Sequence, residues 1–280
     1  MTEKHLRQKS FSDEIIHCLT TLRTPNAPEN GSLALHVCEN PKDVLAARAM
    51  LEGDTLPLSQ WVLAWQKHTN HVARVSAADW GKGAFESETS IMETDGLYTT
   101  EPNTLIGVFT ADCQGILFYD KTVPVIAAVH SGWKGTVSTI VLSLINALKK
   151  DGLFHPETLK VRFSPSLMTD SFEVGPEVVE QFETMARQVG ISLEGLIYKG
   201  KGDRSFIDHQ QVNVRLLEKA GVPTENITIS TCDTKTNLDC FSYRRDGRSC
   251  GEHFTCIWMD EKKPEISPES HCQKEKEFEQ

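Results

Sequence analysis

Short runs of β-branched and apolar residues follow one another near the middle of the chain and recur towards its end. The central runs are Leu105–Thr110, Gln114–Tyr119 and Val123–His130, and the later ones are Ile227–Ser230 and Phe254–Met259. Runs of this length and composition, bounded by turn residues, predict β-strands. Because the three central runs have no helix between them, they do not fit the strand–helix alternation of a parallel α/β fold. The pattern favours an α+β fold built on mixed sheets.

Three stretches between the central and the late strands carry apolar residues at the spacing of an amphipathic helix. The first opens at Thr136 and closes with two lysines and Gly152, which is typical of a helix end. The second follows Pro176, and the third begins at Asp208, whose carboxylate suits an N-cap. The sequence therefore predicts three helices on the same domain as the strands.

Polar and charged positions dominate both ends of the chain. Residues 1–12 are polar, and residues 261–280 read EKKPEISPESHCQKEKEFEQ, with very little apolar surface to bury. Between them there is no linker, repeat or low-complexity block. We therefore expect a flexible N-terminus over 1–12, one catalytic domain over 13–260, and a disordered charged tail over 261–280.

Composition and charge narrow the partners. The chain has 280 residues, with 29 Lys+Arg against 39 Asp+Glu and a net charge of −10, which argues against a nucleic-acid partner. The longest apolar run, 125–129, is too short to cross a bilayer. Eight cysteines in a chain that can build a core predict reduced thiols, and the polar N-terminal residues do not resemble a secretory signal. We expect a cytoplasmic protein without a membrane partner, acting on a small molecule; its oligomeric state does not follow.

The central strands bring a cysteine and a histidine together. If the second and third strands form a hairpin with a two-residue loop at Lys121-Thr122, then Cys113 lies opposite His130 on the same face. Pro124 is a poor ladder residue and points to a different register. A thiolate–imidazole pair suits either a cysteine nucleophile activated by histidine or part of a zinc site with an open position.

A third ligand lies upstream in the segment WQKHTNHVARV, which contains two histidines. Either His68 or His71 is a candidate: their i, i+3 spacing puts both on one face if the stretch is helical, although Val72 and Val75 indicate a strand. The spacing of these residues matches no known metal signature, so the choice between them stays open at this point.

Several segments together resemble one known family, the laccase-domain or YfiH-like proteins. The family blocks Q-x-H-G, T-A-D-C, H-A-G-W-R-G, F-E-V and F-S-Y-R-R-D occur here in the same order and span about residues 30–260. In this chain they read Gln66-Lys67-His68, Thr110-Ala111-Asp112-Cys113, His130-Ser131-Gly132-Trp133-Lys134-Gly135, Phe172-Glu173-Val174 and Phe241-Ser242-Tyr243-Arg244-Arg245-Asp246.

The resemblance implies a fold, a metal and an activity. The fold is a single-domain α/β/β/α sandwich of mixed sheets. The metal is Zn²⁺ held by His68, Cys113 and His130, with a water in the fourth position. The activity is phosphorolysis of adenosine, inosine, guanosine or methylthioadenosine, with phosphate as co-substrate, together with deamination of adenosine. The same three residues are then the catalytic ones.

Phosphorolysis also needs a cationic seat for phosphate. Arg48, Arg244 and Arg245 are the candidates, since arginine holds phosphate in a bidentate way. Asp112 is adjacent to Cys113 and is expected to point to the opposite face, so we interpret it as a residue that supports the metal ligands rather than the acid or base.

The chain departs from the family blocks at several positions. The replacements that affect phosphate and nucleoside binding introduce a hydroxyl, exchange arginine for lysine, remove glycines or reverse a charge; they are Ser131, Lys134, Ser164, Met168 and Glu252. These changes leave the three proposed metal ligands intact. They allow a shifted substrate or a weakened enzyme.

Three alternatives belong to other functional classes. The first is a metal-free cysteine hydrolase acting on an amide, such as a peptidoglycan precursor, with Cys113 as nucleophile and His130 as base. The second is a copper polyphenol oxidase, although the sequence lacks further histidine-rich clusters. The third is a protein that binds nucleosides without turnover. Four late cysteines at 232, 240, 250 and 256 lack C-x₂-C spacing, so they predict no second zinc site.

Overall fold

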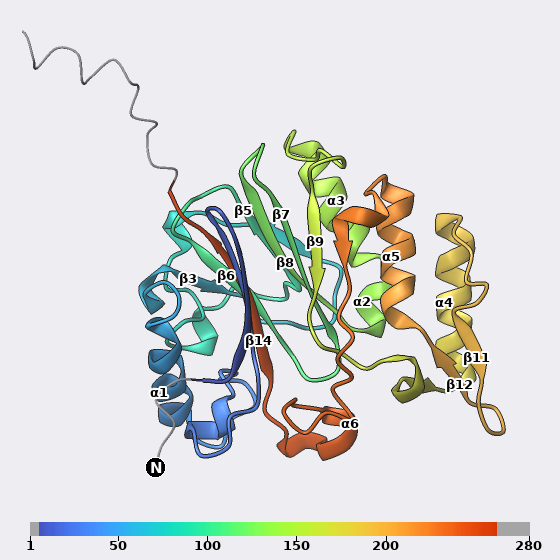
Figure 1. The fold of residues 1–280 in the computed structure, drawn as a ribbon, viewed down its shortest axis with the longest axis horizontal. Coiled ribbons are helices and arrows are strands. Elements are labelled where there is room, and N and C mark those ends of the chain that lie inside the picture. The colour runs from blue at the N-terminus through green and yellow to red at the C-terminus, as the bar shows by residue number, and fades with distance from the viewer. Residues whose placement is uncertain (1–5, 262–280) are drawn as a thin grey trace, which may run out of the picture.

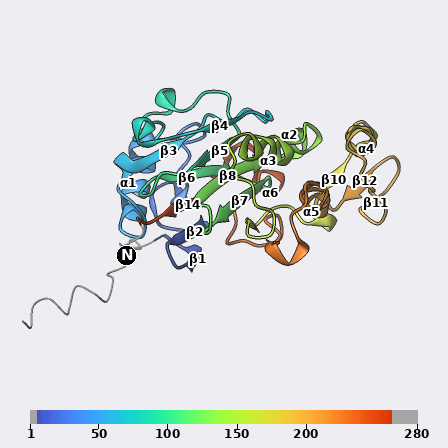
Figure 2. The ribbon, with the colours of Figure 1, turned by 90° about the horizontal axis from the view of Figure 1, so that it is seen from above.

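Two β-sheets pack face to face and helices cover both outer faces (Figure 1, Figure 2). The structure is a computed structural model and describes residues 6–261. Within that range there are three sheets and six α-helices. The helices are α1 (Pro41–Glu52), α2 (Trp133–Val137), α3 (Ile140–Lys150), α4 (Pro176–Val189), α5 (His209–Ala220) and α6 (Tyr243–Asp246).

Each large sheet mixes parallel and antiparallel pairs. The five-stranded sheet has the order β1 (Gln8–Asp13), β2 (Ile16–Thr21), β14 (His253–Met259), β6 (Leu105–Thr110) and β3 (Trp61–Leu63). The six-stranded sheet has the order β13 (Ile227–Thr228), β9 (Lys160–Phe163), β7 (Gln114–Asp120), β8 (Val125–Ser131), β5 (Gly96–Thr99) and β4 (Val72–Arg74). A small third sheet joins β10 (Glu173–Val174), β12 (Ser205–Ile207) and β11 (Ile197–Lys199).

The core lies in three layers, which explains why the central strands are apolar on both faces. On β8, Ile126 and Ala128 pack between the two sheets, whereas Val125, Ala127 and Val129 face the helices α3 and α5. Successive side chains on a strand alternate between its faces, so a strand covered on both sides must be apolar at every position. The expected mixed-sheet α+β fold, an α/β/β/α sandwich, is confirmed.

The hairpin register differs from the expected one. Gly115, not Cys113, lies opposite His130, and the turn between β7 and β8 spans residues 121–124. Asp120 closes this longer turn, because its Oδ1 accepts hydrogen bonds from the Thr122 and Val123 N–H groups. The four-residue turn leaves Pro124 outside the ladder, where its missing N–H costs nothing. The register is shifted by two residues.

The helix expected from Thr136 is two helices. Helix α2 begins at Trp133, directly after Gly132, and α3 begins at Ile140. Thr139 between them has φ 60°, in the left-handed region. The threonine and valine residues around the break are poor helix formers, because β-branching restricts their rotamers. The helices expected after Pro176 and Asp208 are found, and the Asp208 carboxylate accepts from Gln211 N.

The ends of the domain include one change from the expected boundaries. Residues 8–12, expected to belong to a flexible N-terminus, lie in strand β1, where they pair with β2 from Gln8 to Asp13. Phe11 packs there against Tyr119 with ring centroids 6.3 Å apart. Residues 1–5 and 262–280, which include nearly all of the expected tail, lie outside the described residues.

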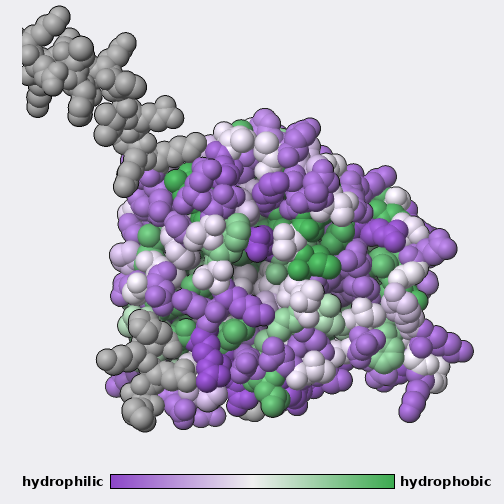
Figure 3. Space-filling view, viewed as in Figure 1, coloured by the Kyte–Doolittle hydropathy of each residue, from purple (hydrophilic) through white to green (hydrophobic). Residues whose placement is uncertain are grey.

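The surface in Figure 3 is largely hydrophilic, with smaller apolar patches between the charged residues. Among residues 6–261, none of the helices has both the length and the apolar character that crossing a bilayer requires.

His253, on β14, gives the fold a sensitivity to acid. Its Nδ1 lies 2.6 Å from Thr21 O and its Nε2 lies 3.0 Å from Phe241 N. This arrangement fits a neutral ring that donates through Nδ1 and accepts through Nε2, and burial lowers the pKa of His253 to about 4. At a pH between about 4 and the ordinary histidine pKa of about 6.5, the ring is therefore neutral in the folded protein and takes up a proton on unfolding.

We therefore expect the free energy of unfolding to fall as the pH drops from 6.5 towards 5. In that window the unfolded state binds more protons than the folded state, and one such histidine contributes a slope of up to about 1.4 kcal/mol per pH unit. In His253→Gln the slope should become shallower, as measured by urea denaturation at pH 7 and pH 5. Equal losses in the variant and the original protein would contradict this assignment.

Candidate active site

Three side chains from separate segments converge at one end of the sandwich. His68 lies in the loop after β3, Cys113 in the turn between β6 and β7, and His130 near the end of β8. Their ligand atoms all lie within 4.8 Å of one another. The His68 and His130 ring centroids are 4.7 Å apart, and Cys113 Sγ is 4.0 Å from His68 Nε2. This group is arranged to hold a metal ion.

The backbone around the group is shaped to bring these side chains together. A Cβ atom at Gly132 would lie 2.8 Å from His68 Cδ2 and 2.9 Å from Cys113 Sγ, so only glycine leaves room for both. Asp112 has φ 89° and His68 has φ 58°. Positive φ at residues other than glycine costs energy, and it persists where the surroundings impose it, often at functional sites.

Asp95, at the start of β5, fixes two of the three side chains. Its Oδ1 lies 2.8 Å from His130 Nδ1 and 3.0 Å from His68 N, and its Oδ2 accepts from Lys67 N, Thr69 N and Thr69 Oγ1. The carboxylate is fully buried. Because His130 Nδ1 is bonded to Asp95, its Nε2 is the nitrogen available to a metal, as in the carboxylate–histidine–metal arrangement.

Asp95 does not stand out in the sequence as a residue of the site. The signal present was an acidic residue beside a threonine and a glycine at the start of a short apolar run, Thr94-Asp95-Gly96. That pattern also fits an ordinary turn.

The electrostatics favour charged forms at the centre of the group. Burial acts to raise the pKa of Asp95, but hydrogen bonds and charge from His130 together with backbone N–H groups lower it to about 2. Burial acts to lower the pKa of His130, yet Asp95 and the Cys113 thiolate raise it to about 10. Burial acts to raise the pKa of Cys113, and the two histidines lower it to about 7. A thiolate is therefore accessible at neutral pH.

Asp112 holds the turn that carries Cys113. Its Oδ1 accepts from Thr234 Oγ1 and its Oδ2 accepts from Arg244 N, both at 2.6 Å. Both carboxylate oxygens thus accept hydrogen bonds from late segments of the chain, one from the loop before α6 and one from α6 itself. Asp112 and Cys113 line the same pocket instead of pointing to opposite faces, because residues 111–113 form a turn rather than a strand. A supporting role for Asp112 stays a prediction.

The three side chains open into a pocket of about 700 Å³, a volume that suits a small-molecule ligand. Apolar and aromatic side chains form much of its wall, including Phe109, Trp133, Leu167, Phe172 and Tyr243. Polar and charged groups complete it, namely Gln66, His68, Thr110, Asp112, Cys113, His130, His209, Arg244, Arg248 and Glu252, with His36 at the rim beside Glu252.

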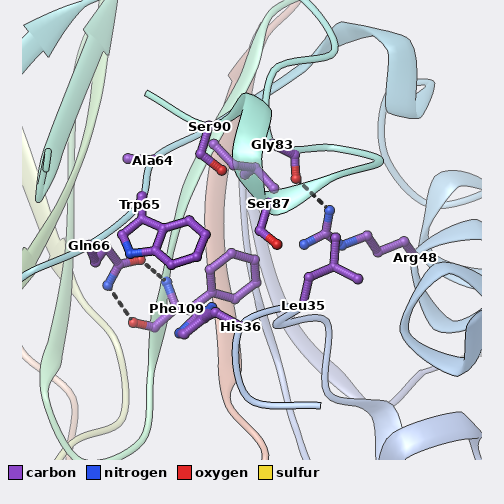
Figure 4. Close-up of a pocket in the computed structure, with 11 residues that line it drawn as sticks. Leu35, His36, Arg48, Ala64, Trp65, Gln66, Gly83, Ser87, Ser90 and Phe109 are labelled. Carbon is purple, nitrogen blue, oxygen red and sulfur yellow. Dashed lines mark hydrogen bonds between the residues drawn. The ribbon is translucent and has the colours of Figure 1, made fainter. Parts of the chain in front are cut away.

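Arg48 does not reach this pocket. It is 1% exposed, and its guanidinium donates to the carbonyl oxygens of Leu33 and Ala84. It also donates to Gly83 O, as Figure 4 shows. Burial lowers its pKa to about 10. It borders a separate cavity of about 20 Å³, too small for phosphate. The expectation that Arg48 seats phosphate is corrected: its donors brace the backbone around helix α1.

Arg245 is also committed to the backbone. Its Nη1 donates to the carbonyls of Thr234, Lys235 and Asn237, its Nη2 donates to Cys240 O at 2.6 Å, and it forms an ion pair with Asp246. It does not line the pocket. Arg244 does, and its Nη1 donates to Ser171 O and Glu173 O.

Of His71 and the five replacements in the family blocks named above, only Glu252 lines the pocket. His71 stands apart from the metal-binding group, and its Nδ1 lies 3.0 Å from Thr94 Oγ1. Ser131 and Ser164 are buried and hydrogen-bonded, to Thr136 and to Gly115 N. Neither Lys134 nor Met168 lines the pocket, whereas Glu252 does, 3.1 Å from His36 Nε2.

Two further histidines, His36 and His209, line the pocket and do not stand out in the sequence. His209, at the start of α5, stacks on Phe172 with ring centroids 5.1 Å apart and lies 2.6 Å from Thr136 Oγ1. Burial lowers its pKa to about 3, so the ring is neutral. In the described part of the chain, no other cluster of His, Cys, Asp or Glu is arranged to hold a metal.

The chain is similar in sequence to proteins of one family. Residues 23–260 match the family described as "Multi-copper polyphenol oxidoreductase laccase". The chain is 33% identical over 233 residues to purine nucleoside phosphorylase SSP1584 of Staphylococcus saprophyticus, covering 82% of this chain and 86% of that protein. It is 30% identical over 254 residues to adenosine deaminase RL5 of an unknown prokaryotic organism, covering 88% and 95%.

The fold resembles that of a solved structure. A crystal structure of a Bacillus licheniformis protein, described as hypothetical protein YfiH, superposes with a TM-score of 0.82 at 26% identity, covering 88% of this chain and 93% of that one.

Proposed function

The chain belongs to the multi-copper polyphenol oxidoreductase laccase family, and from that membership we propose a zinc-dependent purine nucleoside enzyme. It uses phosphate to cleave purine nucleosides, namely adenosine, inosine, guanosine and methylthioadenosine. It also deaminates adenosine. The observation that carries the proposal is the convergence of His68, Cys113 and His130 in one pocket. The names of the relatives supply the reactions.

The donor set fits zinc. Two imidazoles and a thiolate within 4.8 Å are soft to borderline ligands, and three protein ligands with one open position are typical of catalytic zinc. When bound, zinc supplies a Lewis acid and lowers the pKa of water at the open position to about 7. We do not assign a copper-dependent oxidation to this chain. The described residues contain one group that can hold a metal ion, and a multicopper centre needs several metal-binding groups.

The protein's own groups position the metal ligands and the nucleoside. Asp95 orients His130 and, through backbone N–H groups, the loop that carries His68. Phe172 and His209 form a stacked aromatic wall that suits a purine ring. The neutral His209 adds no charge to that wall, which favours an uncharged base.

Two charged residues divide the two reactions between them. Arg244 and Arg248 are the two arginines that line the pocket. The Nη1 of Arg244 donates to main-chain carbonyls, which holds its guanidinium at the wall, and we assign phosphate to it. Two carboxylates line the pocket, those of Asp112 and Glu252. The Asp112 carboxylate accepts from the Arg244 N–H group, whereas the Glu252 carboxylate lies 3.1 Å from His36 Nε2. We assign the proton transfers of deamination to the Glu252–His36 pair.

The direct test is purified protein with adenosine or inosine, with and without phosphate. Ribose-1-phosphate and free base report phosphorolysis, and conversion of adenosine to inosine reports deamination. We expect both reactions from the zinc-loaded protein. Nucleoside binding by calorimetry without either product would instead support a binding protein.

Paired substitutions should separate the reactions. In Arg244→Ala, we expect the KM for phosphate to rise at least 10-fold while the deamination rate stays within about twofold, because only phosphorolysis needs the anion. In Glu252→Gln, deamination should fall at least 10-fold. Arg215→Ala, which removes a partly exposed arginine on α5 that does not line the pocket, is the control. If both reactions fall together in each variant, the division is wrong.

A second candidate is favoured by one feature of the site. Cys113, His130 and Asp95 form a thiol–imidazole–carboxylate series, and the pKa of Cys113 is lowered to about 7. This arrangement suits a metal-free cysteine hydrolase acting on an amide. Alkylation of Cys113 with iodoacetamide, with and without added zinc, distinguishes the two: protection by zinc supports the metal enzyme, and amide turnover in chelator supports the hydrolase.

A further inference from the structure

Two cysteines outside the pocket lie in contact. Cys232 Sγ and Cys240 Sγ are 3.6 Å apart in the loop between β13 and α6. Cys240 is fully buried and Cys232 is partly exposed. Asn237 Nδ2 lies 3.2 Å from Cys232 Sγ, as a donor to that sulfur. The two thiols therefore form a pair in which one member is open to small molecules.

We propose that Cys232 and Cys240 are a redox-active pair that forms a reversible disulfide by exchange with a low-molecular-weight disulfide. The Cys232 thiolate attacks one sulfur of the small disulfide, and the other half leaves as a thiolate. Cys240 then gives its proton to solvent and attacks the Cys232 sulfur, which releases the second small thiol. Two protein thiols are oxidised and one small disulfide is reduced to two thiols, so atoms and electrons balance.

The surroundings assign the two roles. Cys232 is the attacking residue because it is partly exposed and because the Asn237 N–H group stabilises negative charge on its sulfur. Cys240 is the resolving residue: burial and the neighbouring Cys232 raise its pKa to about 12. It reacts only when its partner already carries the leaving group. The sulfur atoms need to move from 3.6 Å to about 2.05 Å, a short approach within one loop.

The loop closed by this bond braces the pocket. Thr234 donates to Asp112 beside Cys113, and Asp233 accepts from Ser171 Oγ at 2.6 Å and from Met168 N. Arg245 clamps the loop carbonyls from the other side. A disulfide across residues 232–240 therefore locks the segment that holds the turn of Cys113 and the wall near Phe172.

The test uses the full-length reduced protein, loaded with zinc and incubated with glutathione disulfide. Free thiols are alkylated and the protein is digested with trypsin. We expect the peptides 220–235 and 236–244 to be joined through Cys232 and Cys240, with loss of two hydrogens, and to separate on reduction. Since the bond restricts the unfolded chain, the melting temperature should rise by about 5 °C.

Three variants make the result specific. Cys38→Ser, which removes another partly exposed cysteine, should form the disulfide as the original protein does. Cys240→Ser should stop at the glutathione adduct on Cys232, and Cys232→Ser should leave Cys240 free for alkylation after unfolding. The proposal is overturned if the original protein stops at the adduct, if neither thiol reacts, or if Cys232 pairs with any other cysteine, Cys272 included. These readouts do not depend on nucleoside turnover.

Discussion

In Asp95→Asn, zinc affinity falls by about 10- to 100-fold and nucleoside turnover falls at least as far. The carboxylate accepts from His130 Nδ1 and from three backbone N–H groups around His68. An amide presents an NH₂ group to some of these donors, so His130 loses its orientation and the His68 loop loses its anchor. Partners that orient a metal-bound histidine typically contribute this much to affinity. A competition titration with a fluorescent zinc chelator measures it.

The same substitution should destabilise the fold by about 3 kcal/mol, because donors to a buried charge lose their acceptor. Asp120→Asn is the matched control. Asp120 is equally buried, lies at the far end of the β7–β8 hairpin, and accepts from Thr122 and Val123. We expect it to lower stability while zinc affinity stays unchanged. If both variants bind zinc like the original protein, Asp95 has no role in the metal site.

In Cys113→Ala, bound zinc falls from about one per chain to near zero, and both nucleoside reactions fall by at least about 1000-fold. The thiolate is one of three protein ligands, and two imidazoles on an open loop and a strand do not hold zinc tightly. Metal content by mass spectrometry of dialysed protein gives the first result, and initial rates with adenosine give the second.

Cys250→Ala controls for the loss of a thiol from the pocket region. Cys250 is buried, borders the same pocket, and lies outside the metal-binding group. We expect this variant to keep its zinc and most of its activity. Retention of zinc and turnover in Cys113→Ala would show that the reaction is carried elsewhere. Loss of turnover with zinc retained would point to the cysteine hydrolase.

The sequence predicts several strands and helices of this fold because period-two and period-3.6 patterns depend on local burial, whereas the sandwich of layers was implied by the family resemblance. The runs at Leu105–Thr110 and Gln114–Tyr119 are strands within one residue of the expected bounds. The predicted register of the β7–β8 hairpin was wrong. The length of its turn depends on how Asp120 caps it, and the pattern of apolar residues in the strands does not encode this. Cys113 lies outside the ladder, in the turn before β7, and this turn rather than a strand pairing brings its side chain to His130.

The polar partners of the site could not be predicted in the same way. Arg48 and Arg245 have the residue type of a phosphate ligand, but their donors are used by main-chain carbonyls that come together only in the folded chain. Asp95 is separated from His130 by 35 positions, and its role depends on the pairing of β5 with β8. Motif resemblance points to the three side chains that converge, whereas the contacts that support them arise from tertiary packing.

X-ray absorption at the zinc edge of the purified, metal-loaded protein, with Cys113→Ala alongside, identifies the ligand atoms of the bound metal. We expect one sulfur at about 2.3 Å and two imidazole nitrogens at about 2.0–2.1 Å, with a lighter fourth ligand that changes when nucleoside is added. The sulfur shell should vanish in the variant. A spectrum without sulfur in the original protein, or one showing several sulfurs, would contradict a site made by His68, Cys113 and His130.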